Sequence, residues 1–165
     1  MQPRPPCNPQ SIADDKVANF TLKVIAEHDP AQPLHMYVAW HNVHEPLEVP
    51  QAQLDRFNFV FDNCTSMDGG VAGGKNNTCS SGEHGPLVTG GDGAKECCFR
   101  QFYSAMANYV DMHVGQVVDA LKAKGMWDNT LMVVSSDNGE FAVRPPTAAQ
   151  PPTLHAPRLA ASAHR

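Results

Sequence analysis

The sequence lacks several features that would place it in common classes of protein. None of its apolar runs approaches the roughly 18 consecutive residues that a membrane-spanning helix needs, and the first residues contain no apolar core of a signal peptide. Charged residues make up only 18% of the chain, and 17 of them are acidic against 12 basic. Neutralising phosphates takes a surplus of lysine and arginine, so the sequence predicts neither a membrane nor a nucleic acid as partner.

Acidic residues are missing from the C-terminal stretch. The last of them is Glu140, whereas Arg144, Arg158 and Arg165 follow it. The same stretch is rich in proline and alanine, and a nearly uncharged segment of this composition buries too little apolar surface to offset its ordering entropy. We therefore predict a disordered tail over residues 141–165.

Paired Cys-x-x-Cys motifs are also lacking, which disfavours a structural zinc site. Four of the five cysteines instead share a glycine-rich stretch, residues 62–98, where cross-links would fix the chain: Cys64, Cys79, Cys97 and Cys98. Three sequons for N-glycosylation begin at Asn19, Asn63 and Asn76, and these count only in a secreted protein. Together these features favour an oxidising compartment. The alternative, free thiols and sequons that arise by chance, stays open on sequence alone.

The N-terminal part predicts a helix followed by a buried strand. Ser11 with Asp14 three positions later predicts the start of the helix, and apolar residues at helical spacing continue to Ile25, before Asp29 and a proline end the pattern. Residues 34–40 form a short apolar run with β-branched and aromatic side chains, which favours a buried strand.

Further along, the pattern predicts two more helices and a second strand. Pro50 can open a short helix that runs to Phe57. The clearest periodicity places apolar residues on one face of a helix over residues 102–121, with Gly125 expected directly after its last turn and a strand at 130–135. This order predicts an α/β fold, with a mostly parallel sheet flanked by helices, in which ligands gather at the carboxyl ends of the strands.

Two polar clusters follow the predicted strands and are candidates for chemistry. Asp137 and Asn138 offer carboxylate and carboxamide oxygens to a hard cation such as calcium or magnesium, but Asn138 and Gly139 equally suit a hairpin turn or an ordinary polar loop. His44 follows the first strand, where a solvated surface histidine is the plain alternative to a catalytic one.

Three residues on the apolar face of the helix at 102–121 are more simply explained as core residues than as part of a functional site. His113 lies on that face and is expected to be a core histidine paired with a neighbour. Met106 and Tyr109 are likewise expected to be core residues rather than part of a cofactor site.

Three segments, in this order, resemble the sulfatase family, closest to the arylsulfatase B type. They are residues 33–50, with Asn42-Val-His-Glu-Pro-Leu-Glu-Val-Pro50 as the most specific piece, then residues 103–121, then residues 125–139 with the strand that ends in Asp-Asn-Gly. The resemblance covers roughly residues 11–61 and 99–140 and implies an incomplete α/β fold of the alkaline-phosphatase and sulfatase kind.

The resemblance implies a sulfuric ester hydrolase. In sulfatases a cysteine converted to formylglycine and held on calcium attacks sulfur, and the metal stabilises charge on the sulfate oxygens. Carried over by motif, Asp137 and Asn138 would bind calcium, and His44 would contact the sulfate or the leaving oxygen as hydrogen-bond donor or general acid. It also implies a sulfated small molecule or polysaccharide as substrate, and a secretory, lysosomal or extracellular location for the full-length protein.

The departures from the family pattern indicate an incomplete active site. The nucleophile motif Cys-x-Pro-Ser-Arg or Cys-x-Ala-Ser-Arg is absent, since Cys7 is followed by Asn-Pro-Gln. The pair of metal-binding aspartates that the family carries after its first strand is also missing, because Asp14 and Asp15 lie at a helix start instead. The lysine-bearing segment expected after Asp-Asn-Gly is also absent. We therefore expect residues 1–140 to be part of a sulfatase catalytic domain that is inactive alone, because the formylglycine motif and other metal ligands are absent.

Two alternatives to a sulfatase remain on sequence. One is a non-catalytic fragment or pseudoenzyme that binds a partner through the glycine-rich, cysteine-bearing insertion at residues 62–98. The other is a phosphodiesterase of the same superfamily, which the Val-His-Glu-Pro-Leu-Glu-Val-Pro stretch disfavours.

Overall fold

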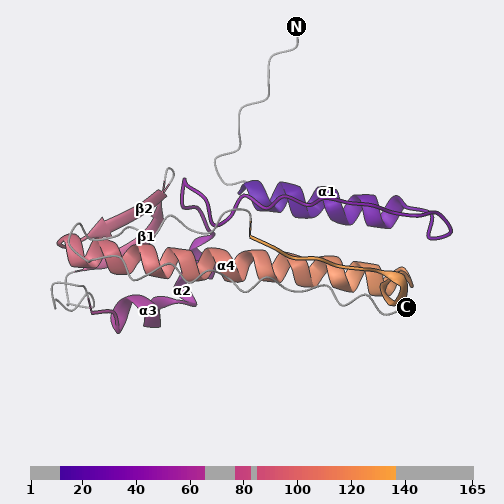
Figure 1. Ribbon diagram of the computed structural model, residues 1–165. Helices are drawn as coiled ribbons and strands as arrows, with labels where there is room; N and C mark the ends of the chain where they lie inside the picture. The colour runs from indigo at the N-terminus through magenta and orange to yellow at the C-terminus, as the bar shows by residue number, and fades with distance from the viewer. Residues whose placement is uncertain (1–11, 66–76, 83–84, 137–165) are drawn as a thin grey trace, which may run out of the picture. The chain divides into compact units, whose positions relative to one another are not determined.

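The computed structural model describes residues 12–65, 77–82 and 85–136 (Figure 1). Cys7, Asp137, Asn138 and the predicted tail at 141–165 lie outside the described residues. The chain divides into two compact units, Met1–Thr130 and Leu131–Arg165, and each is taken by itself below. None of the described helices is both long enough and apolar enough to cross a membrane.

Helix α1 spans Ala13–Glu27 and packs against helix α4, which spans Asp92–Ala123 (Figure 1). The helix-capping residue is Ile12, which makes no side-chain cap bond, so the sequence prediction of a start at Ser11 was wrong by about one residue. The sequence analysis treated Asp14 as part of the helix start, whereas its carboxylate accepts hydrogen bonds from a loop that is distant in sequence.

Helix α4 confirms the periodic pattern of the sequence and extends it toward the N-terminus. Its buried face holds the predicted core residues Met106, Tyr109 and His113. Gly125 follows the helix with a φ of 69°, and its N–H donates to the carbonyl of Lys122, while the next N–H reaches the carbonyl of Leu121. This pair of bonds is a Schellman motif, and glycine takes its left-handed position without steric cost.

Short helices and strands precede α4. Two short helices, α2 (Gln51–Asp55) and α3 (Asn58–Asp62), precede a hairpin of β1 (Thr78–Gly82) and β2 (Gly85–Thr89). The hairpin is antiparallel, and Cys79 lies opposite Val88 in its register.

Two disulfides join this segment to α4: Cys64 to Cys97, and Cys79 to Cys98. Cys97 and Cys98 are neighbours in the helix and are fully buried. Successive residues of an α-helix point about 100° apart, so neighbouring cysteines can reach two different elements. The expectation that cross-links fix this stretch is confirmed.

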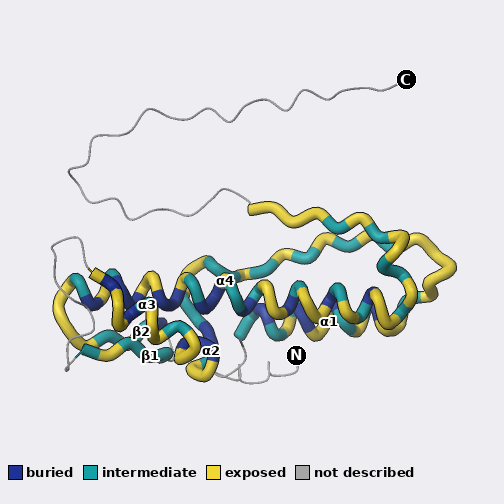
Figure 2. The backbone as a smooth tube through the Cα atoms, turned by 90° about the horizontal axis from the view of Figure 1, so that it is seen from below, coloured by how far each residue is buried: buried dark blue, intermediate teal, exposed yellow. Residues whose placement is uncertain are grey.

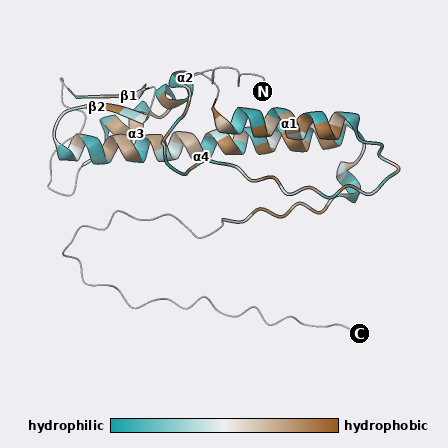
Figure 3. Cartoon of the chain, turned by 90° about the horizontal axis from the view of Figure 1, so that it is seen from above, coloured by the Kyte–Doolittle hydropathy of each residue, from teal (hydrophilic) through white to brown (hydrophobic). Residues whose placement is uncertain are grey.

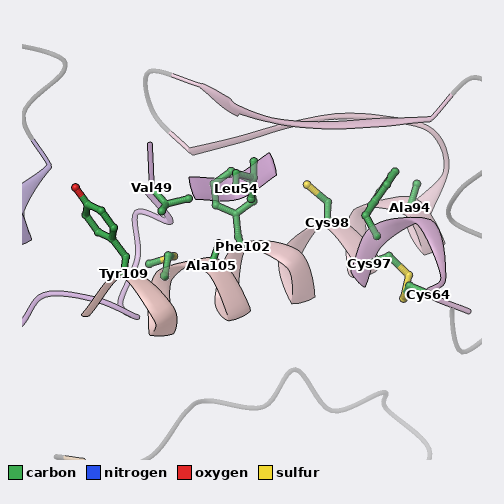
Figure 4. Close-up of a cluster of buried hydrophobic side chains, with 11 residues drawn as sticks. Val49, Leu54, Cys64, Ala94, Cys97, Cys98, Phe102, Ala105 and Tyr109 are labelled. Carbon is green, nitrogen blue, oxygen red and sulfur yellow. A yellow bond between two sulfur atoms is a disulfide. The ribbon is translucent and has the colours of Figure 1, made fainter. Parts of the chain in front are cut away.

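The core lies between the first half of α4 and the segments that the disulfides attach to it (Figures 2 and 4). Both long helices carry hydrophobic and hydrophilic residues along their length, as amphipathic helices do (Figure 3). The buried cluster comprises Val49, Leu54, Phe61, Cys64, Ala94, Cys97, Cys98, Phe102, Ala105, Met106 and Tyr109.

The two predicted strands are extended but unpaired in the described part of the chain, where the only sheet is the β1–β2 hairpin. Along residues 34–40 half-buried and exposed residues alternate, and Tyr37 is 89% exposed. In the second unit, Leu131 and Val133 are 90% and 78% exposed. A period of two is the pattern of a strand, but a sheet needs a neighbour to satisfy its backbone N–H and C=O groups. The predicted parallel sheet is therefore not formed by the described residues.

Candidate functional site

The loop that carries His44 follows directly on the extended segment at residues 34–40. Its peptide bonds at Asn42–Val43 and Glu45–Pro46 are cis. The backbone N–H of His44 donates to the carbonyl of His41 at 3.0 Å and closes a turn. The sequence prediction of a polar loop after residue 40 is confirmed.

The ring of His44 is exposed and oriented by its own loop. Nδ1 lies 2.7 Å from the carbonyl oxygen of Glu45. A carbonyl only accepts hydrogen bonds, so Nδ1 carries the proton and Nε2 is the acceptor atom of the neutral ring. The ring of His41 meets that of His44 edge to face, with centroids 5.8 Å apart. When protonated, the outer nitrogen of His44 can donate a hydrogen bond to an oxyanion.

The loop is attached to the first turn of α1 by a buried carboxylate. Asp14 is 0% exposed, and its oxygens accept the backbone N–H groups of His41 at 2.7 Å and Asn42 at 3.2 Å. Hydrogen bonds to a charged acceptor are stronger than neutral ones. These two bonds satisfy the carboxylate that burial would otherwise penalise.

The next residue, Asp15, joins α1 to the middle of α4. Its Oδ1 accepts the hydroxyl of Tyr109 at 2.5 Å and lies 3.3 Å from Nε2 of His113. The other ring nitrogen of His113 lies 3.0 Å from Oε1 of Gln116, which confirms the expected core histidine with a neighbouring partner. Burial raises the pKa of Tyr109 well above its usual range, and the bond to Asp15 and the charges of both aspartates raise it further.

The described residues do not fit a calcium ion. Among residues 12–65, 77–82 and 85–136, no group of three or more histidine, cysteine or acidic side chains could hold a metal. The carboxylates of Asp14 and Asp15 accept hydrogen bonds from backbone N–H groups and from the Tyr109 hydroxyl. Asp137 and Asn138 lie outside the described residues, so their role as metal ligands stays a prediction.

Sequence reasoning missed the role of Asp14, although a signal was present. The buried face of α1 consists of Asp14, Ala18, Thr21 and Ile25, at the spacing of a single helix stripe. An acidic residue in the first turn is ordinarily explained by the helix dipole. Its position on the apolar stripe was the indication that it bonds to something inside the protein.

Comparisons with known proteins match this chain to sulfatases. The family model for sulfatases matches residues 1–161. Arylsulfatase J of Mus musculus is 26% identical over 117 residues, which is 71% of this chain and 14% of that protein. A sulfatase of Schizosaccharomyces pombe, described as uncharacterized, is 44% identical over 39 residues, 24% of this chain and 7% of that protein. No solved structure matches.

Proposed function

We propose, from the premise that this chain belongs to the sulfatase family, that the full-length protein hydrolyses sulfate esters and that this segment contributes His44 to its active site. The chain spans 14% of the length of the arylsulfatase that it matches. The observation that carries the proposal is the exposed His44 ring, with its Nδ1 held by Glu45, on a loop that a buried carboxylate fixes.

The chemistry proposed for His44 follows from its tautomer. With Nδ1–H engaged by the carbonyl of Glu45, only Nε2 is left to contact a substrate. A protonated ring would donate from Nε2 to a sulfate oxygen, or would supply the proton that the leaving oxygen needs as the S–O bond breaks. Histidine suits this role because its ordinary pKa lies close to neutral pH.

The fold proposed for the complete domain is a mostly parallel sheet flanked by helices. The alternating burial along residues 34–40 and the exposed apolar side chains at Leu131 and Val133 support two strands that lack their neighbours. Strands that carry apolar residues on both faces are typical of parallel sheets covered by helices. In that sheet the His44 loop and Asp137 would both follow carboxyl ends of strands.

Asp137 and Asn138 are the residues that we propose for calcium in the complete site. A bound calcium ion would stabilise negative charge on the sulfate oxygens. Two ligands form only part of a calcium cage, since the ion takes six to eight oxygens. The sequence also contains no Cys-x-Pro-Ser-Arg or Cys-x-Ala-Ser-Arg motif for the formylglycine, so we propose that the chain is inactive alone.

The compartment that we propose is the secretory pathway, the lysosome or the extracellular space. Two disulfides in the described residues support it, because such bonds persist in oxidising surroundings. Asn19 and Asn63, two of the sequon asparagines, are exposed.

The function is tested by sulfate-ester hydrolysis. The full-length protein that contains this segment should release 4-methylumbelliferone from its sulfate, and His44→Ala should lower kcat by about 100-fold or more. The matched variant His28→Ala, at a histidine that directly follows α1 and contacts the carbonyl of Gln32, should leave the rate unchanged.

The substrate class is tested with the same fluorophore. Faster release from a phosphodiester of the fluorophore than from its sulfate would favour the phosphodiesterase alternative. Release by the isolated 165-residue chain, abolished by Asp137→Ala, would contradict its inactivity.

A second candidate function is a binding module built on the cross-linked segment. The β1–β2 hairpin is tied to α4 by Cys79–Cys98, and Leu87 on β2 is 60% exposed. This cross-linked hairpin, with its exposed apolar side chain, is the surface that we propose for contact with another protein. A partner of this kind should protect residues 62–98 from proteolysis, and scrambling that stretch should abolish binding.

A further inference from the structure

We propose that Asp14 is a positioning residue for His44, so that the first turn of α1 sets the orientation of the imidazole in the active site. The inference rests on the proposed role of His44 in sulfate-ester hydrolysis. It adds a residue to which the sequence patterns and the resemblance assign no catalytic or binding function.

Asp14 forms hydrogen bonds with the start of the His44 loop. The fully buried carboxylate accepts two consecutive backbone N–H groups, those of His41 and Asn42, from a segment 27 and 28 positions away in sequence. A buried carboxylate without these donors would carry an uncompensated charge. The helix start and the loop are therefore held to one geometry.

His41 connects the Asp14 carboxylate to His44. His41 gives its N–H to Asp14 and its carbonyl to the N–H of His44, so one peptide segment is bonded at both ends. The rings of His41 and His44 are also in edge-to-face contact. A shift of His41 therefore moves both the turn and the ring that packs against His44.

The two long helices have contacts with each other that do not involve Asp14, so the loop can be loosened without unfolding the helix pair. Asp15 independently connects α1 to Tyr109 of α4, and at the other end of α1 the Lys124 ammonium donates to the carbonyl of Ala26 at 2.5 Å. These contacts remain when Asp14 is changed. Asp14 thus acts on the loop, while its neighbours hold the helices.

The experiment uses the intact 165-residue chain and does not depend on catalysis. Asp14→Asn keeps one acceptor oxygen but turns an amide toward a backbone donor, and Asp14→Ala removes both acceptors. Asp111→Asn, at an exposed position of α4, removes the same charge and serves as the matched control. Nitrogen NMR of the His44 ring reports its tautomer, and hydrogen exchange reports the amides of His41 and Asn42.

Both Asp14 variants should retain the far-ultraviolet circular dichroism of the helices. The His41 or Asn42 amide should exchange about tenfold faster or more, and the Nδ1–H tautomer of His44 should lose its dominance. Asp111→Asn should change neither signal. If Asp14→Ala does not fold, Asp14→Asn decides the question alone.

Unchanged exchange and an unchanged His44 tautomer in folded Asp14→Asn would overturn the proposal, as would equal changes in Asp111→Asn. Loss of the α4 amide protection together with that of the loop would also overturn it, because Asp14 would then act on the whole fold. Absence of sulfatase activity in the full-length protein would defeat the proposed function but would leave these measurements unaffected.

Discussion

The indole of Trp40 lies flat on the imidazole of His113, with ring planes 9° apart. Trp40 immediately precedes the His44 loop, and His113 is 5% exposed in the middle of α4. Tyr109 meets the same imidazole edge on, with centroids 4.7 Å apart. The position of the candidate loop thus depends on a stacked aromatic contact as well as on hydrogen bonds.

Replacing His113 should test how much this contact stabilises the protein. His113→Ala removes the stacked ring and leaves a cavity beside Trp40, so the free energy of unfolding should fall by about 2–4 kcal/mol. Urea denaturation followed by tryptophan fluorescence measures the change. Met112→Ala, at a more exposed neighbouring position of α4, should cost clearly less, and an equal loss would contradict the stacked contact.

The buried hydroxyl of Tyr109 predicts a pH dependence at the alkaline end. Its pKa is raised above the ordinary value of 10.0, first by burial and then by the bond to Asp15 and the nearby negative charges. Because the folded-state pKa exceeds the unfolded one, this group stabilises the fold fully below pH 10, and the contribution is lost as the pH rises through the folded-state pKa.

Ultraviolet titration of the tyrosines measures this effect. Tyr109 should ionise in a late step of the titration, above its ordinary pKa value of 10.0. Tyr109→Phe should remove the late step and reduce the loss of stability with pH above 10. Ionisation of Tyr109 at its ordinary pKa in the folded protein would contradict the buried, hydrogen-bonded hydroxyl.

The disulfide pairing is open to direct test. Peptide mapping without reduction should find Cys64 joined to Cys97 and Cys79 joined to Cys98. Because Cys97 and Cys98 are adjacent, the digest must separate them, for example by partial acid hydrolysis. Cys79→Ala should lower the free energy of unfolding by about 3 kcal/mol, since the bridge closes a loop of sequence separation 19. The exchanged pairing of Cys64 with Cys98 would contradict the structure.

The exposed apolar residues predict that the isolated chain aggregates. Leu131, Val133 and Val134 are each more than three-quarters exposed in an extended segment, which is the usual template for edge-to-edge association. Val133→Lys should reduce light scattering on concentration. Ser135→Lys, also exposed in the same segment, adds the same charge without removing an apolar side chain and should help less.

Thermal denaturation provides an independent check. We expect the isolated monomer to unfold over a broad range of temperature, because two predicted strands lack the neighbours of a sheet. A sharp cooperative transition would contradict this expectation.

The sequence was most informative where one periodicity extends over many turns. Helix α4 could be located from its apolar face, and Gly125 from the need for a left-handed residue after it. The extended runs at residues 34–40 and 131–135 were recognisable as local patterns. Their pairing was not recognisable, because a sheet depends on backbone groups supplied by other segments.

Other features depended on contacts that no local pattern reveals. The disulfide pairing could not be chosen from spacing, since four cysteines allow three arrangements. The bond from Asp14 to His41 crosses 27 positions of sequence and competes with the ordinary explanation of an acidic helix start. The position of His44 in a loop after the first predicted strand was predictable from the sequence, whereas the hydrogen bonds of Asp14 to that loop were found only in the structure.

The Cys64–Cys97 bridge has a further consequence for what happens after proteolysis. If a protease cuts the peptide bond after any residue from 64 to 96, one fragment contains Cys64 and the other contains Cys97. The two pieces stay covalently joined, so the fragment that carries His44 remains attached to the fragment that contains most of α4. A nicked molecule would therefore migrate as a single species until a reductant separates the halves.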